Sequence, residues 1–120
     1  MISPVNIAAD AIVGVVAALH LYFLVLEMFL WDTPTGRRTF GLEPAFATES
    51  KTLAANQGLY NGFLVAGLVW GLVADRTDVK LFFLGCVIVA GAYGAVTVSR
   101  RILFAQALPA LVGFVLVLAA

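Results

Sequence analysis

One acidic residue, Glu27, stands inside a long apolar segment, and chemistry is first expected there. A carboxyl group surrounded by hydrocarbon is costly to bury and usually has a functional role. Glu27 could carry a proton, act as a general base or balance the charge of a bound cation. The structural alternative is an ion pair with Arg100 or Arg101 that fixes helix packing near the membrane surface.

Amides and a phenol gather in a second segment. Within two helical turns, directly before the apolar run 63–72, the chain carries Asn56, Gln57, Tyr60 and Asn61. Hydrogen bonds between neighbouring helices account for one or two such side chains. Three amides beside a tyrosine favour a cavity filled by a ligand or by water. This segment is predicted to supply one wall of a polar pocket.

The single histidine, His20, and the single cysteine, Cys86, limit other chemistries. His20 is interpreted as a hydrogen-bonded core residue, with a proton relay or a substrate contact as the alternative. Since no second His or Cys lies near the pocket, no metal site is predicted. Cys86 is interpreted as a packing residue. The sequence has no nucleophilic triad, phosphate-binding glycine loop or haem-attachment motif, so no cofactor is predicted.

The elements that must position these residues are predicted to be transmembrane helices. Of 120 residues, 62% are hydrophobic and 12% are charged, against roughly 25% charged in soluble domains. Uncharged runs span 11–26, 52–74, 81–99 and 102–120, and a helix needs about 20 apolar residues to cross a bilayer. The predicted fold is all-α: one transmembrane domain, residues 1–120, forming an integral membrane four-helix bundle. Its expected helices are about 5–31, 52–73, 79–99 and 102–120, with a long loop at 32–51.

Basic residues predict the orientation. The side of the long loop holds five of them: Arg37, Arg38, Lys51, Arg100 and Arg101. The side of the termini holds two, Arg76 and Lys80. Because positive charge stays cytoplasmic, both termini are predicted to be extracytoplasmic in a multi-pass protein of the cell (inner) membrane. The N-terminal residues lack the pattern of a secretory signal, so the first helix is expected to stay in the mature protein.

This topology gathers polar side chains in the cytoplasmic half of the bilayer. The third helix would end there with Tyr93 and Thr97, Arg100 would follow, and the fourth helix would begin there with Gln106. His20 would lie near the midplane, about 16 Å from Trp31. The opposite half is expected to be close to uniformly apolar. The predicted ligand-binding residues are Glu27, His20, Asn56, Gln57, Tyr60, Asn61, Tyr93, Thr97, Arg100 and Gln106.

Glycines, a proline and the long loop give further expectations about helix packing and shape. Two G-x-x-x-G steps, at 58–62 and 67–71, favour close helix packing within one bundle, with a homodimer through these faces as the alternative. Pro109 is expected to kink the fourth helix and free a carbonyl near Ala105. The long loop is expected to be either a lid on the membrane surface or an ordinary connector.

The chain also resembles a known family. The resemblance rests on HLYFLVLEMFLW at 20–31, FGL at 40–42, LAANQGLYNGFLVAGLVWGL at 53–72, FFLGCVIVAGAYGAVTV at 82–98 and QALPA at 106–110. It is similar to the small bacterial integral membrane proteins of the domain of unknown function family 1304. The resemblance covers nearly the whole chain, and NQGLYNGF is its most specific part. It implies a four-helix membrane protein and no particular reaction.

Three functions remain open. The first is binding of a small amphipathic or lipophilic molecule, whose head group would approach Glu27 and the amides. The second is a proton-coupled exporter acting as a dimer, similar by analogy to the small multidrug resistance exporters. The third is a membrane enzyme that uses Glu27 for acid/base chemistry on a lipophilic substrate. The expected partners are the lipid bilayer and this molecule, and the zero net charge gives no indication of nucleic acid.

Overall fold

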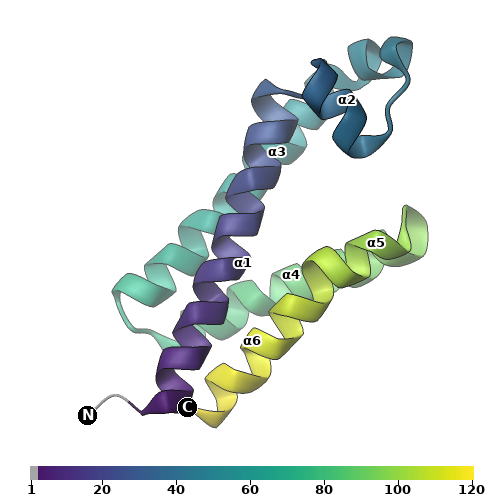
Figure 1. Cartoon of the computed structure of the whole chain (residues 1–120). Helices are drawn as coiled ribbons and strands as arrows, with labels where there is room; N and C mark the ends of the chain where they lie inside the picture. The colour runs from purple at the N-terminus through teal and green to yellow at the C-terminus, as the bar shows by residue number, and fades with distance from the viewer. Residues whose placement is uncertain (1–2) are drawn as a thin grey trace. The chain divides into compact units, whose positions relative to one another are not determined.

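The computed structural model describes residues 3–120, and every regular element in this range is a helix. The prediction of an all-α protein is therefore confirmed. Along the chain the elements are α1 (Pro4–Phe29), α2 (Pro34–Phe40), α3 (Pro44–Val73), α4 (Thr77–Thr97), α5 (Arg100–Ile102), the π-helix η1 (Leu103–Ala107) and α6 (Leu108–Ala119), as drawn in Figure 1.

Among the described residues, three helical segments are long and apolar enough to cross a membrane: Pro4–Phe29, Thr77–Thr97 and Arg100–Ala119. The third segment joins α5, η1 and α6. Helix α3 has 30 residues, but its first half carries charges and amides that lower its hydropathy. A bundle with four crossings therefore stays a prediction.

The predicted loop at 32–51 is wrong, because most of it is helical. Thr33 caps α2 with an extended backbone and accepts a hydrogen bond from Gly36 N–H, and Pro34 follows at the first helical position. Gly41 ends α2 in the left-handed conformation, with φ at 65°. A second proline, Pro44, then begins α3. A Thr-Pro pair favours the start of a helix, and a glycine favours its end. These local preferences form helices here although the segment is rich in charged residues.

The chain forms two compact units, and α1 and α3 contribute to both. Residues 3–18 and 66–120 make the unit that we call the α4–α6 unit. Leu19–Val65 makes the second, which we call the α2 unit.

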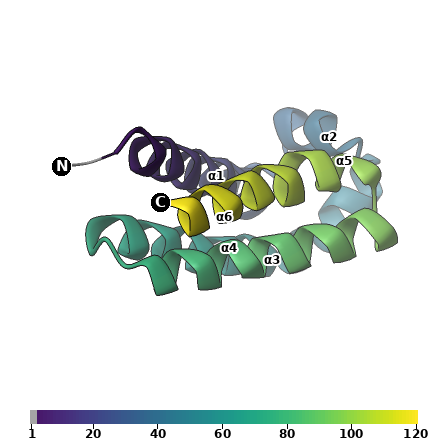
Figure 2. The same ribbon diagram turned by 90° about the horizontal axis from the view of Figure 1, so that it is seen from below.

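In the α4–α6 unit, α4 and α6 lie side by side, as Figures 1 and 2 both show. Small residues make this close packing possible. A Cβ atom at Gly91 would lie 2.8 Å from the Ala107 backbone nitrogen. A Cβ atom at Gly113 would lie 3.1 Å from Ile12 Cγ2. The fully buried side chains of this unit include Val13, Leu68, Leu84, Val87 and Ala110.

The π-helix η1 lies directly before the predicted helix-breaking residue, Pro109. Proline has no N–H group, so it cannot donate to the carbonyl four residues earlier, at Ala105. The Leu108 N–H donates instead to the Leu103 oxygen, five residues earlier. Such a wide turn is the usual way in which a helix accommodates a local break in its hydrogen bonds.

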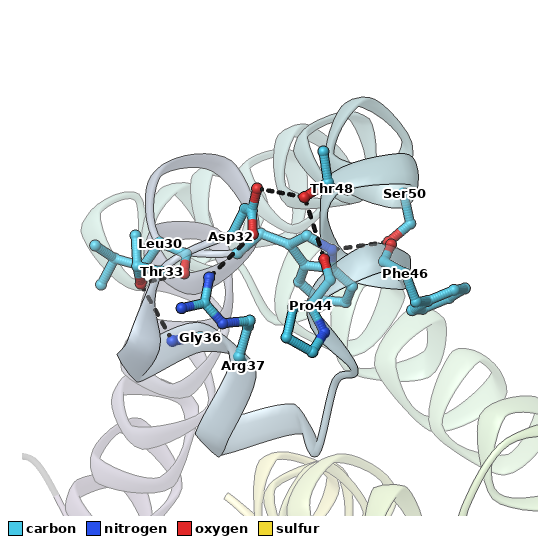
Figure 3. A network of polar contacts seen from close by, with 10 residues as sticks. Leu30, Asp32, Thr33, Gly36, Arg37, Pro44, Phe46, Thr48 and Ser50 are labelled. Carbon is cyan, nitrogen blue, oxygen red and sulfur yellow. Dashed lines mark hydrogen bonds and ion pairs between the residues drawn. The ribbon is translucent and has the colours of Figure 1, made fainter.

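In the α2 unit, a network of polar contacts holds α2 and the start of α3 to the end of α1 (Figure 3). Trp31 Nε1 donates to Ser50 Oγ at 2.9 Å. Asp32 accepts from Arg37 Nη1 at 3.1 Å and from Thr48 Oγ1 at 3.0 Å. The segment predicted to be a lid or connector is therefore fixed at both of its ends.

The glycines of the two G-x-x-x-G steps face neighbours within their own chain. In the α2 unit, Gly58 and Gly62 approach Leu24, and in the α4–α6 unit Gly67 abuts the Phe83 ring. Gly71 approaches Lys80 in the same way. These contacts are those expected for packing within one chain, and the homodimer stays a prediction.

Candidate functional site

The α2 unit joins Glu27 of α1 to Asn61 of α3. Asn61 Nδ2 donates a hydrogen bond to Glu27 Oε1, and Asn61 is only 6% exposed. Gly58, one turn before Asn61, explains how the two helices come close enough. A Cβ atom at Gly58 would lie 3.2 Å from both Glu27 Cβ and the Leu24 carbonyl oxygen.

Glu27 occupies a position that disfavours a negative charge. It lies in the last turn of α1, where the helix carbonyls carry a partial negative charge. Helix α1, all of whose residues are described, has no basic residue in that turn. The Asn61 amide supplies a donor, but a carboxylate has room for about four hydrogen bonds. The pair can therefore accept further donors from a bound group.

His20 lies in the same unit and is almost completely buried. Its ring packs edge-on against Phe23, with ring centroids 5.5 Å apart. This environment is that of a core histidine, in agreement with the interpretation from the sequence.

Of the other predicted residues of α3, Asn56 and Tyr60 lie on faces of the helix different from that of Asn61, whereas Gln57 lies four residues before Asn61 and close to its face. Gly58 and Asn61, three residues apart, define the face towards α1. Asn56, Gln57 and Tyr60 are exposed, and Tyr60 packs edge-on against Phe63 at 5.8 Å. Because successive helical residues are rotated by about 100°, Asn56 and Tyr60 point well away from the Asn61 face.

The remaining predicted residues belong to the α4–α6 unit, so their approach to Glu27 stays a prediction. Tyr93, Thr97 and Arg100 are exposed there, and Gln106 is half-buried. The Thr97 hydroxyl donates to the Tyr93 carbonyl oxygen at 2.7 Å, within its own helix.

The α4–α6 unit contains an ionic cluster that the sequence interpretation missed. Lys80 Nζ donates to Asp10 Oδ1 at 2.9 Å and to Asp75 Oδ1 at 3.0 Å. The Lys80 side chain is only 6% exposed. The cluster lies next to the apolar stretches expected in the opposite half, and the apolar character of that half stays a prediction. The signal was present in the sequence. The predicted topology places the starts of the first and third helices on one side of the membrane, so Asp10 and Lys80 are expected at a similar depth.

In the part of the chain that the structure describes, no group of three or more His, Cys, Asp or Glu side chains is arranged to hold a metal ion.

Comparisons with known proteins identify the family and no activity. Residues 14–118 match the model of the family described as protein of unknown function DUF1304. The uncharacterized protein YpaA of Lactococcus lactis subsp. lactis (strain IL1403) is 30% identical over 95 residues, which cover 76% of this chain and 80% of that protein. No solved structure matches the chain. The resemblance seen in the sequence is thus confirmed, and the chain belongs to the DUF1304 family of proteins of unknown function.

Proposed function

We propose that this chain is an integral membrane protein that binds a small amphipathic molecule, whose hydrogen-donating head group contacts Glu27 in the Glu27–Asn61 pair. The observation that carries the proposal is the hydrogen bond between a carboxyl group of α1 and a buried amide of α3. Both groups lie in helices rich in apolar residues, where an ionisable side chain usually has a function.

The chemistry of Glu27 selects the head group. Its carboxylate only accepts hydrogen bonds, and the end of α1 adds a partial negative charge beside it. A cationic or donor-bearing head group is therefore favoured there, and an anionic one is repelled. The apolar residues of the surrounding helices suit the hydrocarbon part of an amphipathic molecule.

The exposed amide of Gln57 gives independent support. Gln57 lies four residues before Asn61, near the same face of a helix whose following residues are strongly apolar. An amide facing lipid tails is costly, so a polar group is expected to cover it. The head group of a bound molecule would do so.

The test uses octylammonium as the probe and thermal unfolding of the protein in lipid nanodiscs as the measurement. A ligand that binds only the folded state stabilises it by RT ln(1 + [L]/Kd). Octylammonium is expected to raise the wild-type Tm with increasing concentration. Glu27→Gln keeps a similar shape but lacks the charge, so the rise should fall by at least half.

Two controls separate site binding from detergent effects. Glu49→Gln changes an exposed carboxyl group of the same α3 helix and should respond like the wild type. Octyl sulfate has the same chain length with an anionic head and should give no stabilisation. An equal response of wild type and Glu27→Gln to octylammonium would refute the proposal.

A further inference from the structure

A cavity of about 350 Å³ lies in the α4–α6 unit, beside the ionic cluster of Lys80 with Asp10 and Asp75. The three charged residues come from α4, from α1 and from the turn between α3 and α4. The cavity therefore lies where three segments of the unit meet.

The positions of the charges define a floor and a mouth. The Lys80 side chain is only 6% exposed, whereas those of Asp10 and Asp75 are 46% and 87% exposed. Lys80 is thus the buried floor of the cavity, and the two carboxylates stand at its opening. Each carboxylate uses Oδ1 for Lys80, which leaves Oδ2 available to accept a hydrogen bond.

The cluster carries one more negative than positive charge, because one ammonium group faces two carboxylates. Lys80 lies in the first turn of α4, where the positive end of the helix dipole disfavours a cation. Two carboxylates are needed to compensate for this unfavourable position and for the burial of Lys80. An incoming anion would meet the excess negative charge at the mouth, so the sign of the site favours a cation.

The walls of the cavity are mixed in character. The Asn6 amide and the Thr77 hydroxyl add polar groups, while Leu72 and Val117 add apolar surface. A metal ion bound to the two carboxylates would gain nothing from the apolar walls. An organic amine uses both features, since its ammonium group donates three hydrogen bonds and its carbon atoms contact the apolar side chains.

We propose that this cavity binds a primary ammonium group between Asp10 and Asp75, above Lys80. The group can belong to a small free amine or to the head group of an amine-bearing lipid. This site is distinct in its residues from the Glu27–Asn61 pair, and its existence does not depend on the function proposed above.

The test follows amide resonances of the isotope-labelled protein in phosphatidylcholine nanodiscs during titration with ethylammonium chloride at constant ionic strength. Saturable shifts are expected at Asn6, Thr77 and Lys80. In Asp75→Asn the apparent Kd should rise at least five-fold. The Asp75 side chain is 87% exposed, so this variant should keep its fold, which the remaining resonances report. Asp10→Asn should weaken binding in the same direction.

Matched controls make the result specific. Asp78→Asn changes an exposed carboxylate near the same turn, which pairs with Arg76, and should bind ethylammonium like the wild type. Glu27→Gln should also bind normally, which separates this proposal from the function proposed above. Shifts that do not saturate, that sodium chloride reproduces, or that persist unchanged in Asp75→Asn would overturn the proposal.

A second arm distinguishes the two sources of the ammonium group. Replacing phosphatidylcholine by phosphatidylethanolamine in the nanodiscs adds a primary ammonium head group. If the head group occupies the cavity, the apparent Kd for ethylammonium rises several-fold. An unchanged Kd assigns the cavity to small free amines.

Discussion

At the scale of single residues, each of the two polar clusters contains an ionisable side chain at an unfavourable helix end, and the two side chains are compensated by different groups. Glu27 is an acidic side chain at the negative end of a helix, and Lys80 is a basic side chain at the positive end of another. A neutral amide, Asn61, serves Glu27, whereas two half-exposed or exposed carboxylates serve Lys80. Both clusters therefore keep carboxyl oxygen atoms that can accept a further hydrogen bond, and they differ in that a buried cation lies beside the acceptors only in the Lys80 cluster.

Removing the Asn61 amide should destabilise the protein. In Asn61→Leu the carboxyl group loses its donor while remaining beside apolar side chains, so the free energy of unfolding should fall by about 1–3 kcal/mol. Denaturation of the protein in detergent micelles measures the change. Asn56→Leu, on an exposed position of the same helix, should stay within about 0.5 kcal/mol of the wild type.

The double variant Glu27→Leu with Asn61→Leu sharpens this prediction. Replacing both partners by apolar side chains can be nearly neutral, so the double variant should be more stable than Asn61→Leu alone. If instead the two losses simply add, the hydrogen bond between these side chains does not contribute in the way described.

At the scale of elements, glycine positions decide how closely the helices pack. Gly91 and Gly85 both lie in α4, but their surroundings differ. A Cβ atom at Gly91 would meet the Ala107 nitrogen at 2.8 Å, whereas one at Gly85 would meet nothing within 4 Å. The first glycine sets the distance between α4 and η1, and the second does not limit packing.

Alanine substitutions at these glycines should therefore have opposite signs. Gly85→Ala gains helix propensity and should stabilise the protein by up to about 1 kcal/mol. Gly91→Ala gains the same propensity but overpacks the contact with η1, which costs about 1–3 kcal/mol, and should be destabilised overall. Thermal unfolding of both variants in the same detergent compares them directly. Equal effects at the two positions would mean that α4 and η1 are not packed as described.

At the scale of the whole molecule, the topology depends on whether α3 crosses the membrane. The described residues contain three helical segments that meet the length and hydropathy of a membrane span, and α3 is not one of them. Both termini lie on one side only if α3 also crosses. The seven basic residues divide five against two whether or not α3 crosses, so their distribution orients the chain and an experiment must decide the crossing of α3.

Labelling of single cysteines tests the topology. In a Cys86→Ala background, Thr39→Cys and Thr77→Cys place thiols at exposed positions on either side of α3. A membrane-impermeant maleimide should label Thr77→Cys in intact cells and Thr39→Cys only after permeabilisation. Labelling of both positions in intact cells, or of neither, would show that α3 does not cross.

The sequence by itself determined the all-α class, the apolar segments and the family, because hydropathy over about 20 residues and local motifs are properties of the chain alone. The Thr33-Pro34, Gly41 and Pro44 signals also predict α2 and the early start of α3, although the charges of this segment concealed them. Only the tertiary structure decided which polar residues meet. It joined Glu27 to Asn61, left Asn56 and Tyr60 on other faces of α3, and buried Lys80 between Asp10 and Asp75. Periodicity gives the relative directions of side chains on one helix, whereas packing against a second helix fixes which direction is inward.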